Sequence, residues 1–293
     1  MTVDAGHADA ARLRNLLSAD DVVRLYADRV AVNDDPAYLG RYDKFDFRSR
    51  FGAMVDRVEF PRLITLLEFE RLVTKHAIAA ERVLMLNGGA DGDPELAYLD
   101  HRHVDRADYD EDPARFDLHS PQFDRSDYDF AILSQTLEHL YDPGLAVAQL
   151  FTALAPGGYV WASVPTVSQL HSIPHHFITG FTPIGVACLF AHAGFEVVEV
   201  GQWGNNDFVS QTFALGIFPT FYDLTLRWRG VRHLAWTILT PAAWRRLAGR
   251  RFRLAVSDLV EDGLRNDFSR PAQTWALVRK PQDASAFAGG EPA

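Results

Sequence analysis

Three histidines fall within one short segment of the chain, at His171, His175 and His176. Imidazole takes up a proton near neutral pH, so a histidine beside a binding crevice can act as general base toward a hydroxyl group. We expect His175 or His176 to fill that catalytic role. Three histidines can also hold a metal ion, but no group of carboxylates accompanies them here, and the sequence assigns no metal site.

A strand that ends in polar residues precedes the histidine segment. Residues 130–133 are apolar at every position, as expected for a parallel strand that helices cover on both faces. Ser134 and Gln135 follow at its expected carboxyl end. Because ligands of open α/β sheets bind beside the carboxyl ends of the strands, these two residues are candidates for binding.

A glycine-rich turn follows an earlier strand, which is predicted at 81–86. The turn begins with Asn87, Gly88 and Gly89, where backbone without side chains can approach a ligand closely. It lacks GxGxxG spacing and a neighbouring basic residue, which disfavours an NAD-linked oxidoreductase or an ATP site; an ordinary strand-to-helix turn is the alternative. Asp105 ends the next predicted strand, where an acid can bind ribose hydroxyls, unless it is only one charge of a solvated loop.

The order of helices and strands predicts the fold. Amphipathic helices are expected over 20–32, with Asp20 or Asp21 as N-cap, and on both sides of Pro61. Beyond residue 80, strands alternate with helices up to a last strand at 274–278. This alternation predicts a doubly wound, mostly parallel, Rossmann-like α/β sheet with N-terminal helices and a helical cap insertion.

Taken in order, these features resemble the class I S-adenosylmethionine-dependent methyltransferases, in the branch that acts on small molecules. The resemblance covers most of 80–205, and 266–281 resembles the final strand of that family. It is carried by the turn at 87–92, Asp105, Phe116-Asp117-Leu118, Ser126 to Phe130, Leu137-Glu138-His139, Pro156-Gly157-Gly158 and Ala193 to Val197. The α/β sheet is therefore expected to be a methyltransferase core.

The resemblance implies S-adenosylmethionine as cofactor, laid across the strand ends. Asn87, Gly88 and Gly89 would lie under its methionine part, Asp105 would hold the ribose, and Asp117 with the Leu118 backbone would meet the adenine. Ser134 and Gln135 would lie near the sulfonium, with His139 beside the cofactor. The turn at 87–92 departs from the family pattern, so a non-catalytic, methyltransferase-like binding protein with a degenerate cofactor site is the alternative function.

The implied reaction is methylation of a small molecule, on the hydroxyl of a sugar or secondary metabolite; nitrogen and carbon acceptors stay open. His171 and Phe177 lie in the segment expected to overhang the crevice, and Trp203 and Asn205 follow a later strand back to it. A tryptophan there can stack on a flat or sugar-like acceptor, although such a ring is more often part of a core. We expect these four residues to contact the acceptor.

Composition limits the partners. The net charge of −10 argues against nucleic acid, because phosphate binding needs clustered Lys and Arg. The one cysteine, Cys188, can form no internal disulfide, which fits a reducing cytoplasm. No apolar run reaches the roughly 20 residues of a spanning helix, and the amino terminus has no signal-peptide pattern.

The domain plan follows from these assignments. The segment 213–264 is basic and aromatic, a composition that fits an anionic or lipid-linked acceptor, peripheral membrane contact or a homodimer interface. A helical cap whose arginines extend from a buried face is the simpler interpretation. The predicted units are a disordered leader (1–19), a helical region (20–80), the methyltransferase core (81–212 and 265–281), the helical cap insertion (213–264) and a flexible tail (282–293).

Overall fold

The structure is a computed structural model of the chain. It describes residues 17–31, 40–42, 45–86, 94–107, 118–119, 123, 125–205, 208–209, 212–213, 220, 266 and 269–283. Of the predicted cap at 213–264, all but Phe213 and Thr220 lie outside these residues, and of the tail at 282–293 all but Gln282 and Asp283 do so. The leader and cap predictions therefore stay predictions.

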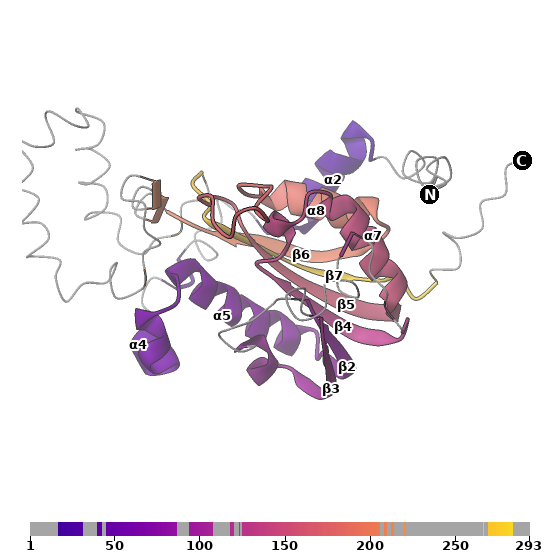
Figure 1. The fold of residues 1–293 in the computed structure, drawn as a ribbon, viewed down its shortest axis with the longest axis horizontal. Coiled ribbons are helices and arrows are strands. Elements are labelled where there is room, and N and C mark those ends of the chain that lie inside the picture. The colour runs from indigo at the N-terminus through magenta and orange to yellow at the C-terminus, as the bar shows by residue number, and fades with distance from the viewer. Residues whose placement is uncertain are drawn as a thin grey trace, which may run out of the picture.

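The described elements alternate between helix and strand along most of the chain (Figure 1). Their order is α2 (Ala19–Arg29), β1 (Val30–Ala31), α4 (Phe47–Phe51), η1 (Gly52–Asp56), α5 (Phe60–Lys75), β2 (Ala79–Met85), η2 (Pro94–Tyr98), β3 (Asp100–Arg106), β4 (Tyr128–Ser134), η3 (Leu137–His139), α7 (Pro143–Ala153), β5 (Leu154–Pro165), α8 (Pro183–His192), β6 (Glu196–Trp203) and β7 (Gln273–Arg279).

The strands form one seven-stranded sheet in the order β1-β6-β7-β5-β4-β2-β3. Every described pairing is parallel except those of β7, which runs antiparallel to both β5 and β6. The predicted mostly parallel, doubly wound α/β sheet is confirmed. The chain passes from β2 outward to β3 and then returns to β4 on the other side of β2. The reversal lies between β2 and β4, and doubly wound sheets bind ligands beyond the carboxyl ends of the strands at such a point.

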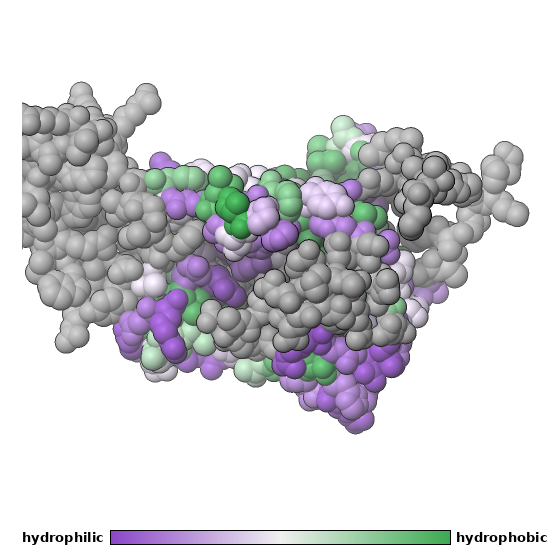
Figure 2. Space-filling view, in the orientation of Figure 1, coloured by the Kyte–Doolittle hydropathy of each residue, from purple (hydrophilic) through white to green (hydrophobic). Residues whose placement is uncertain are grey.

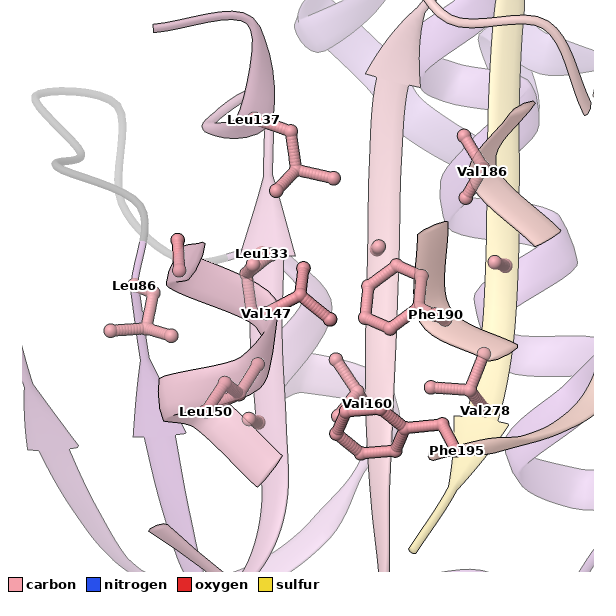
Figure 3. Close-up of a cluster of buried hydrophobic side chains, with 14 of the residues drawn as sticks. Leu86, Leu133, Leu137, Val147, Leu150, Val160, Val186, Phe190, Phe195 and Val278 are labelled. Atoms are coloured by element: carbon pink, nitrogen blue, oxygen red, sulfur yellow. The ribbon is translucent and has the colours of Figure 1, made fainter. Parts of the chain in front are cut away.

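Helices cover both faces of the sheet, so the core has two parts (Figure 1). One face packs against α2, α7 and α8, and Figure 3 shows its interior, with Leu133 of β4, Val147 and Leu150 of α7 and Phe190 of α8 in one apolar cluster. The other face packs mainly against α5, which buries eleven of its sixteen residues. Because β4 is covered on both sides, its apolar residues do not alternate with polar ones.

Local signals explain where several helices begin. Pro61 lies in the first turn of α5, where proline is tolerated because that amide has no helical partner, so the predicted break at Pro61 is confirmed. Thr182 caps α8 by accepting a hydrogen bond from the Gly185 amide. The predicted cap of the first helix is wrong: Ser18, and not Asp20 or Asp21, is the N-cap of α2, and Asp21 completes a reciprocal capping box with it.

The N-terminal region contributes to the sheet, which the helical pattern over 20–32 does not predict. Val30 and Ala31 leave α2 as strand β1 and pair with Val200 and Gly201 of β6. At the opposite edge, β3 carries mostly charged side chains, and Figure 2 shows hydrophilic residues gathered over that corner of the molecule. Charge on an edge strand opposes pairing with other chains. Among the described helices, none combines the length and apolarity needed to cross a membrane.

Candidate active site

A buried carboxylate lies against the carboxyl end of β4. Ser134, the last residue of the strand, donates a hydrogen bond from Oγ to Oε1 of Glu95 on η2. Both side chains are buried, and Oε2 of Glu95 has no hydrogen-bond partner among the described residues. Buried carboxylate oxygens are nearly always satisfied, so a donor from outside the described residues is expected at this atom.

Gln135 turns the chain sharply after β4. Its φ is +56°, a left-handed conformation that residues other than glycine seldom adopt outside functional or tight-turn positions. The turn is held to β5, because both the backbone amide and Nε2 of Gln135 donate to the Ser163 carbonyl, at 2.8 and 3.2 Å. Thr136 fixes the other side through a 3.0 Å hydrogen bond to the Leu86 carbonyl of the β2 end.

Glu138 joins this turn to the histidine segment. Its carbonyl accepts hydrogen bonds from the amides of Phe177 and Ile178, at 3.0 and 3.1 Å. Its carboxylate is buried, and burial raises the pKa to about 7 despite the opposing effects of its own backbone amide and Arg62. The histidine segment is thus attached to the end of β4.

Three imidazoles meet at this junction. His139 of η3 and His171 and His176 of the segment have ring centroids 5.0, 5.5 and 4.4 Å apart, and one nitrogen of each lies within 4.8 Å of the other two. Nδ1 of His139 lies 2.6 Å from the His175 carbonyl, and Nδ1 of His171 lies 2.8 Å from the Gln169 carbonyl. A carbonyl can only accept, so each Nδ1 carries a proton, and the free lone pair of the neutral ring is on Nε2.

His176 differs from its neighbour His175. His176 is 7% exposed and neither of its ring nitrogens has a hydrogen-bond partner in the part of the chain that the structure describes, whereas the His175 side chain is exposed. Burial, together with repulsion from the other imidazoles, lowers the pKa of His176; burial also lowers the pKa of His139, against the effect of its bond to the His175 carbonyl. Both rings are therefore neutral at pH 7 and able to accept a proton.

Part of the predicted cofactor site lies outside the described residues: Asn87, Gly88, Gly89 and Asp117. Leu118 is described and is buried in the core on the α7 side of the sheet.

Asp105 interacts with two side chains of the sheet, Arg82 and Tyr128. Arg82 lies 3.4 Å from its carboxylate, and Tyr128 hydrogen bonds to it; burial and this neighbouring charge raise the pKa of Tyr128 to about 12. In register, Asp105 aligns with Leu84 of β2 and Ala131 of β4, three residues short of Ser134. It thus lies about 10 Å below the end of β4, at 3.3 Å per residue.

The predicted acceptor contacts are divided between surface and core. Phe177 is 49% exposed and packs edge-on against Tyr141, so it is available to a ligand. Trp203 and Asn205 are not: Trp203 is 2% exposed and packs on Phe60, and Asn205 is fully buried. The expectation that these two return to an open crevice is corrected, because β6 extends to Trp203 and carries its ring into the core.

Two carboxylates of the site, Glu95 and Glu138, were not among the predicted residues. Glu95 follows the glycine turn and is flanked by Pro94 and Leu96, an apolar setting that is unusual for an exposed acid. Glu138 lies within the Leu-Glu-His motif, where the sequence favours a local cap or ion pair. Only the packing of η2 and η3 against the strand ends shows that both carboxylates are buried.

Comparison with known proteins concerns the region that contains these side chains. Residues 63–200 match the family model described as "Methyltransferase domain". This region is a methyltransferase domain. It holds the whole of β2 to β5, the Ser134–Glu95 pair and the three histidines. The cofactor of the domain is S-adenosylmethionine.

Solved structures resemble the chain only distantly. The [4+2]-cyclase SpnF is 13% identical with a TM-score of 0.41 over 83% of this chain and 96% of that one. The 1,6-didemethyltoxoflavin-N1-methyltransferase of Burkholderia thailandensis is 16% identical with a TM-score of 0.39, covering 96% and 92%. Phosphoethanolamine N-methyltransferase 2 of Haemonchus contortus is 13% identical with a TM-score of 0.41, and 84% of this chain spans 60% of that longer one. These values carry no conclusion about activity, and no curated protein sequence matches the chain.

The described residues of the methyltransferase domain fit its cofactor chemically. S-adenosylmethionine carries an ammonium group and ribose hydroxyls, all hydrogen-bond donors, and a sulfonium cation. Oε2 of Glu95, which has no partner among the described residues, is a hydrogen-bond acceptor close to the carboxyl end of β4. A buried carboxylate is costly without a donor, and the cofactor carries donors of this kind.

Proposed function

We propose that the chain transfers a methyl group from S-adenosylmethionine to a hydroxyl oxygen of a small molecule, a sugar or another secondary metabolite. The observation that carries this proposal is the cluster of three imidazoles formed by His139, which follows β4, and by His171 and His176, which follow β5. His139 follows Ser134 by five residues, and Ser134 contacts Glu95 of η2, so we assign the acceptor to the histidine cluster and the cofactor to the neighbouring end of β4.

The bound cofactor supplies an electrophilic methyl carbon. The acceptor oxygen forms a bond to that carbon as the carbon–sulfur bond breaks in line with it, and the hydroxyl proton must leave. The protein therefore has to align the two reactants and accept one proton. We assign proton acceptance to the histidine cluster, with His176 favoured over His175 because its buried ring nitrogens have no other partner. Ser134, Glu95 and Gln135 would hold the cofactor side.

The surface around the cluster indicates an acceptor with an apolar part. Leu170, Ile173 and Phe177 of the histidine segment and Tyr141 beside it are large hydrophobic side chains that face solvent. A group of exposed apolar side chains on a protein surface commonly marks a binding site. The proposed acceptor therefore carries its hydroxyl on an aromatic or aliphatic body, or on a sugar attached to one.

The test measures cofactor binding and turnover separately. Binding of S-adenosylhomocysteine is measured by calorimetry, and turnover is measured on a panel of hydroxylated acceptors. We expect His176→Ala to lower turnover by about 100-fold or more, the usual contribution of a general base, with unchanged S-adenosylhomocysteine affinity. His192→Ala, on α8, is the control and should retain both properties.

Two results would contradict the proposal. Failure of the protein to bind either S-adenosylmethionine or S-adenosylhomocysteine at high concentration would exclude methyl transfer. Binding without turnover on any acceptor of the panel would favour a methyltransferase-like binding protein instead.

A further inference from the structure

The three imidazoles of the histidine cluster have the arrangement of a metal site. The sequence alone assigns no metal to His171, His175 and His176, because these residues share one segment without carboxylates. In the folded structure the third histidine of the cluster is His139 of η3, and not the exposed His175. His139 lies 32 positions before His171 in the chain. We propose that His139, His171 and His176 bind one divalent transition-metal ion of the zinc class.

The hydrogen bonds of the cluster set the ligand atoms. Nδ1 of His139 and Nδ1 of His171 each donate to a backbone carbonyl, so each ring presents the lone pair of Nε2. Metal-binding histidines are normally held in this way by a carbonyl or carboxylate on the nitrogen that does not bind the metal. A packed, purely structural cluster would not need both rings to be held in the same tautomer.

His176 supplies an independent observation. Its ring is 7% exposed, and among the described residues neither nitrogen has a hydrogen-bond partner although both are buried. Leaving two buried polar atoms unsatisfied costs free energy, and a bound ion removes part of that cost. The ring lies 4.4 Å from His171 and 5.5 Å from His139, centroid to centroid, so the same ion can reach all three.

The distances between the three ligand atoms are longer than in a metal-bound site, so the side chains must move together when an ion binds. The three ligand atoms lie within 4.8 Å of one another. A tetrahedral ion with bonds of 2.0–2.1 Å brings its nitrogen ligands to about 3.4 Å apart, so shifts of about 1 Å in side-chain position suffice. Neutral imidazoles favour zinc, cobalt, nickel, copper or iron over magnesium or calcium, which prefer oxygen.

Three protein ligands leave a coordination position open, as in catalytic rather than structural zinc sites. Oε1 of Glu138 lies 4.0 Å from Nε2 of His139, so a carboxylate stands beside the metal-facing side of the cluster. An acceptor hydroxyl bound at the open position would lose its proton to solvent more readily, because the ion stabilises the alkoxide; in the metal-bound protein the ion would replace His176 as the group that promotes this proton loss. This role, unlike metal binding itself, rests on the proposed methyl transfer.

The experiment uses full-length, untagged protein that is freed of metal with a chelator and titrated with Co²⁺, which reports its coordination by visible absorption. We expect one Co²⁺ per chain with the intense bands of four-coordinate cobalt, displaced by Zn²⁺. His139→Ala and His171→Ala should each weaken Co²⁺ affinity by about 100-fold or more, beyond the loss expected for a second-shell partner. His175→Ala removes an exposed histidine of the same segment and should bind Co²⁺ like the wild type.

Three outcomes would overturn the metal site: no Co²⁺ or Zn²⁺ bound by the wild type, unchanged affinity in His171→Ala, or an equal loss in His175→Ala. Circular dichroism of each variant checks the fold, and His171→Gln replaces His171→Ala if the latter is unfolded. Because the titration contains neither cofactor nor acceptor, it does not depend on methyl transfer. Undiminished turnover after complete metal removal would overturn only the role of the ion in catalysis.

Discussion

The Ser134 hydroxyl at the end of β4 donates a hydrogen bond to the Glu95 carboxylate, which lies 39 residues earlier in the chain. Between them the chain has run out along β3 and returned, so the contact bridges the point where the sheet reverses its winding. Such a point binds ligands in doubly wound folds because the loops diverge there. One oxygen of Glu95 accepts this hydrogen bond, and the other has no partner among the described residues.

Glu95→Gln tests whether that second oxygen serves the cofactor. The amide can keep the hydrogen bond from Ser134 but loses the negative charge and one acceptor. A hydrogen bond to a charged group contributes about 1.5–3 kcal/mol, so S-adenosylhomocysteine affinity should fall about 10-fold to 100-fold by calorimetry. Stability without ligand should not fall, because an unpaired buried charge is removed.

Glu81→Gln is the matched control for this substitution. Glu81 is an exposed residue of β2 that pairs with Arg102 at 3.1 Å, and its loss should leave S-adenosylhomocysteine affinity unchanged. Equal affinity in Glu95→Gln and the wild type would remove Glu95 from the cofactor site.

The sheet could be predicted from the sequence because its buried strands are apolar and the neighbouring helices begin at recognisable capping residues. Residues 130–133 are apolar throughout, and Thr182-Pro183 begins a helix by a local capping rule. Strand β1 could not be predicted in this way. Two residues at the end of a helix become a strand only because β6 offers a free edge for Val30 and Ala31, and that is a tertiary effect.

The site was less predictable than the fold, for a related reason. His139 and His171 were each identified as site residues, but their meeting depends on the bonds from Phe177 and Ile178 to the Glu138 carbonyl. Trp203 shows the reverse case, in which an aromatic residue near a strand end belongs to the core. Sequence spacing predicts roughly where a strand ends. It does not predict the face on which a side chain lies when the strand is longer than expected, as β6 is at Trp203.

Acid stability should depend on Glu199 of β6. Burial opposes its ionisation, but hydrogen bonds from Arg71 and Lys75 of α5 outweigh this, so the pKa lies below its ordinary value of 4.5. The carboxylate therefore stabilises the fold above pH 4.5, and this contribution is lost as the pH falls through the lower, folded-state pKa. Glu199→Gln should lower the free energy of unfolding by about 1–2 kcal/mol at pH 7 and by less at pH 3.

Urea titrations at the two pH values measure this effect, with Glu70→Gln as control. Glu70 pairs with Arg50 at 2.8 Å in an exposed position, so its loss should cost less than about 0.5 kcal/mol. A Glu199→Gln variant whose loss is the same at pH 3 and pH 7 would show that the carboxylate charge does not stabilise the fold.

Gly180 should be required for the position of the histidine segment. A Cβ atom at this residue would lie 2.1 Å from the Thr166 carbonyl oxygen, and the backbone there is held by a 2.9 Å bond from the Phe181 amide to Pro165. Gly180→Ala must therefore move the segment away from β5, at a cost of about 1–3 kcal/mol. Urea denaturation should show this loss, together with weaker Co²⁺ binding.

Gly185→Ala is the comparison for Gly180→Ala, three residues into α8. Its Cβ would meet only the Thr182 hydroxyl, at 3.1 Å, and alanine is favoured over glycine in a helix by up to about 1 kcal/mol. The free energy of unfolding should stay the same or rise. If the two variants behave alike, the close approach of Gly180 to β5 does not position the segment.

Trp203 and Phe177 should give opposite results when they are replaced by leucine. The Trp203 ring lies 4.6 Å from that of Phe60, centroid to centroid, in the core on the α5 side of the sheet, so Trp203→Leu should cost about 2–4 kcal/mol of stability and leave the acceptor KM unchanged. Phe177 is half exposed beside Tyr141, so Phe177→Leu should raise the acceptor KM at nearly constant stability. Urea denaturation and steady-state kinetics below the unfolding temperature measure the two quantities. A raised KM in Trp203→Leu would return that ring to the acceptor site, because loss of core packing alone reduces the amount of folded enzyme and not its affinity for the acceptor.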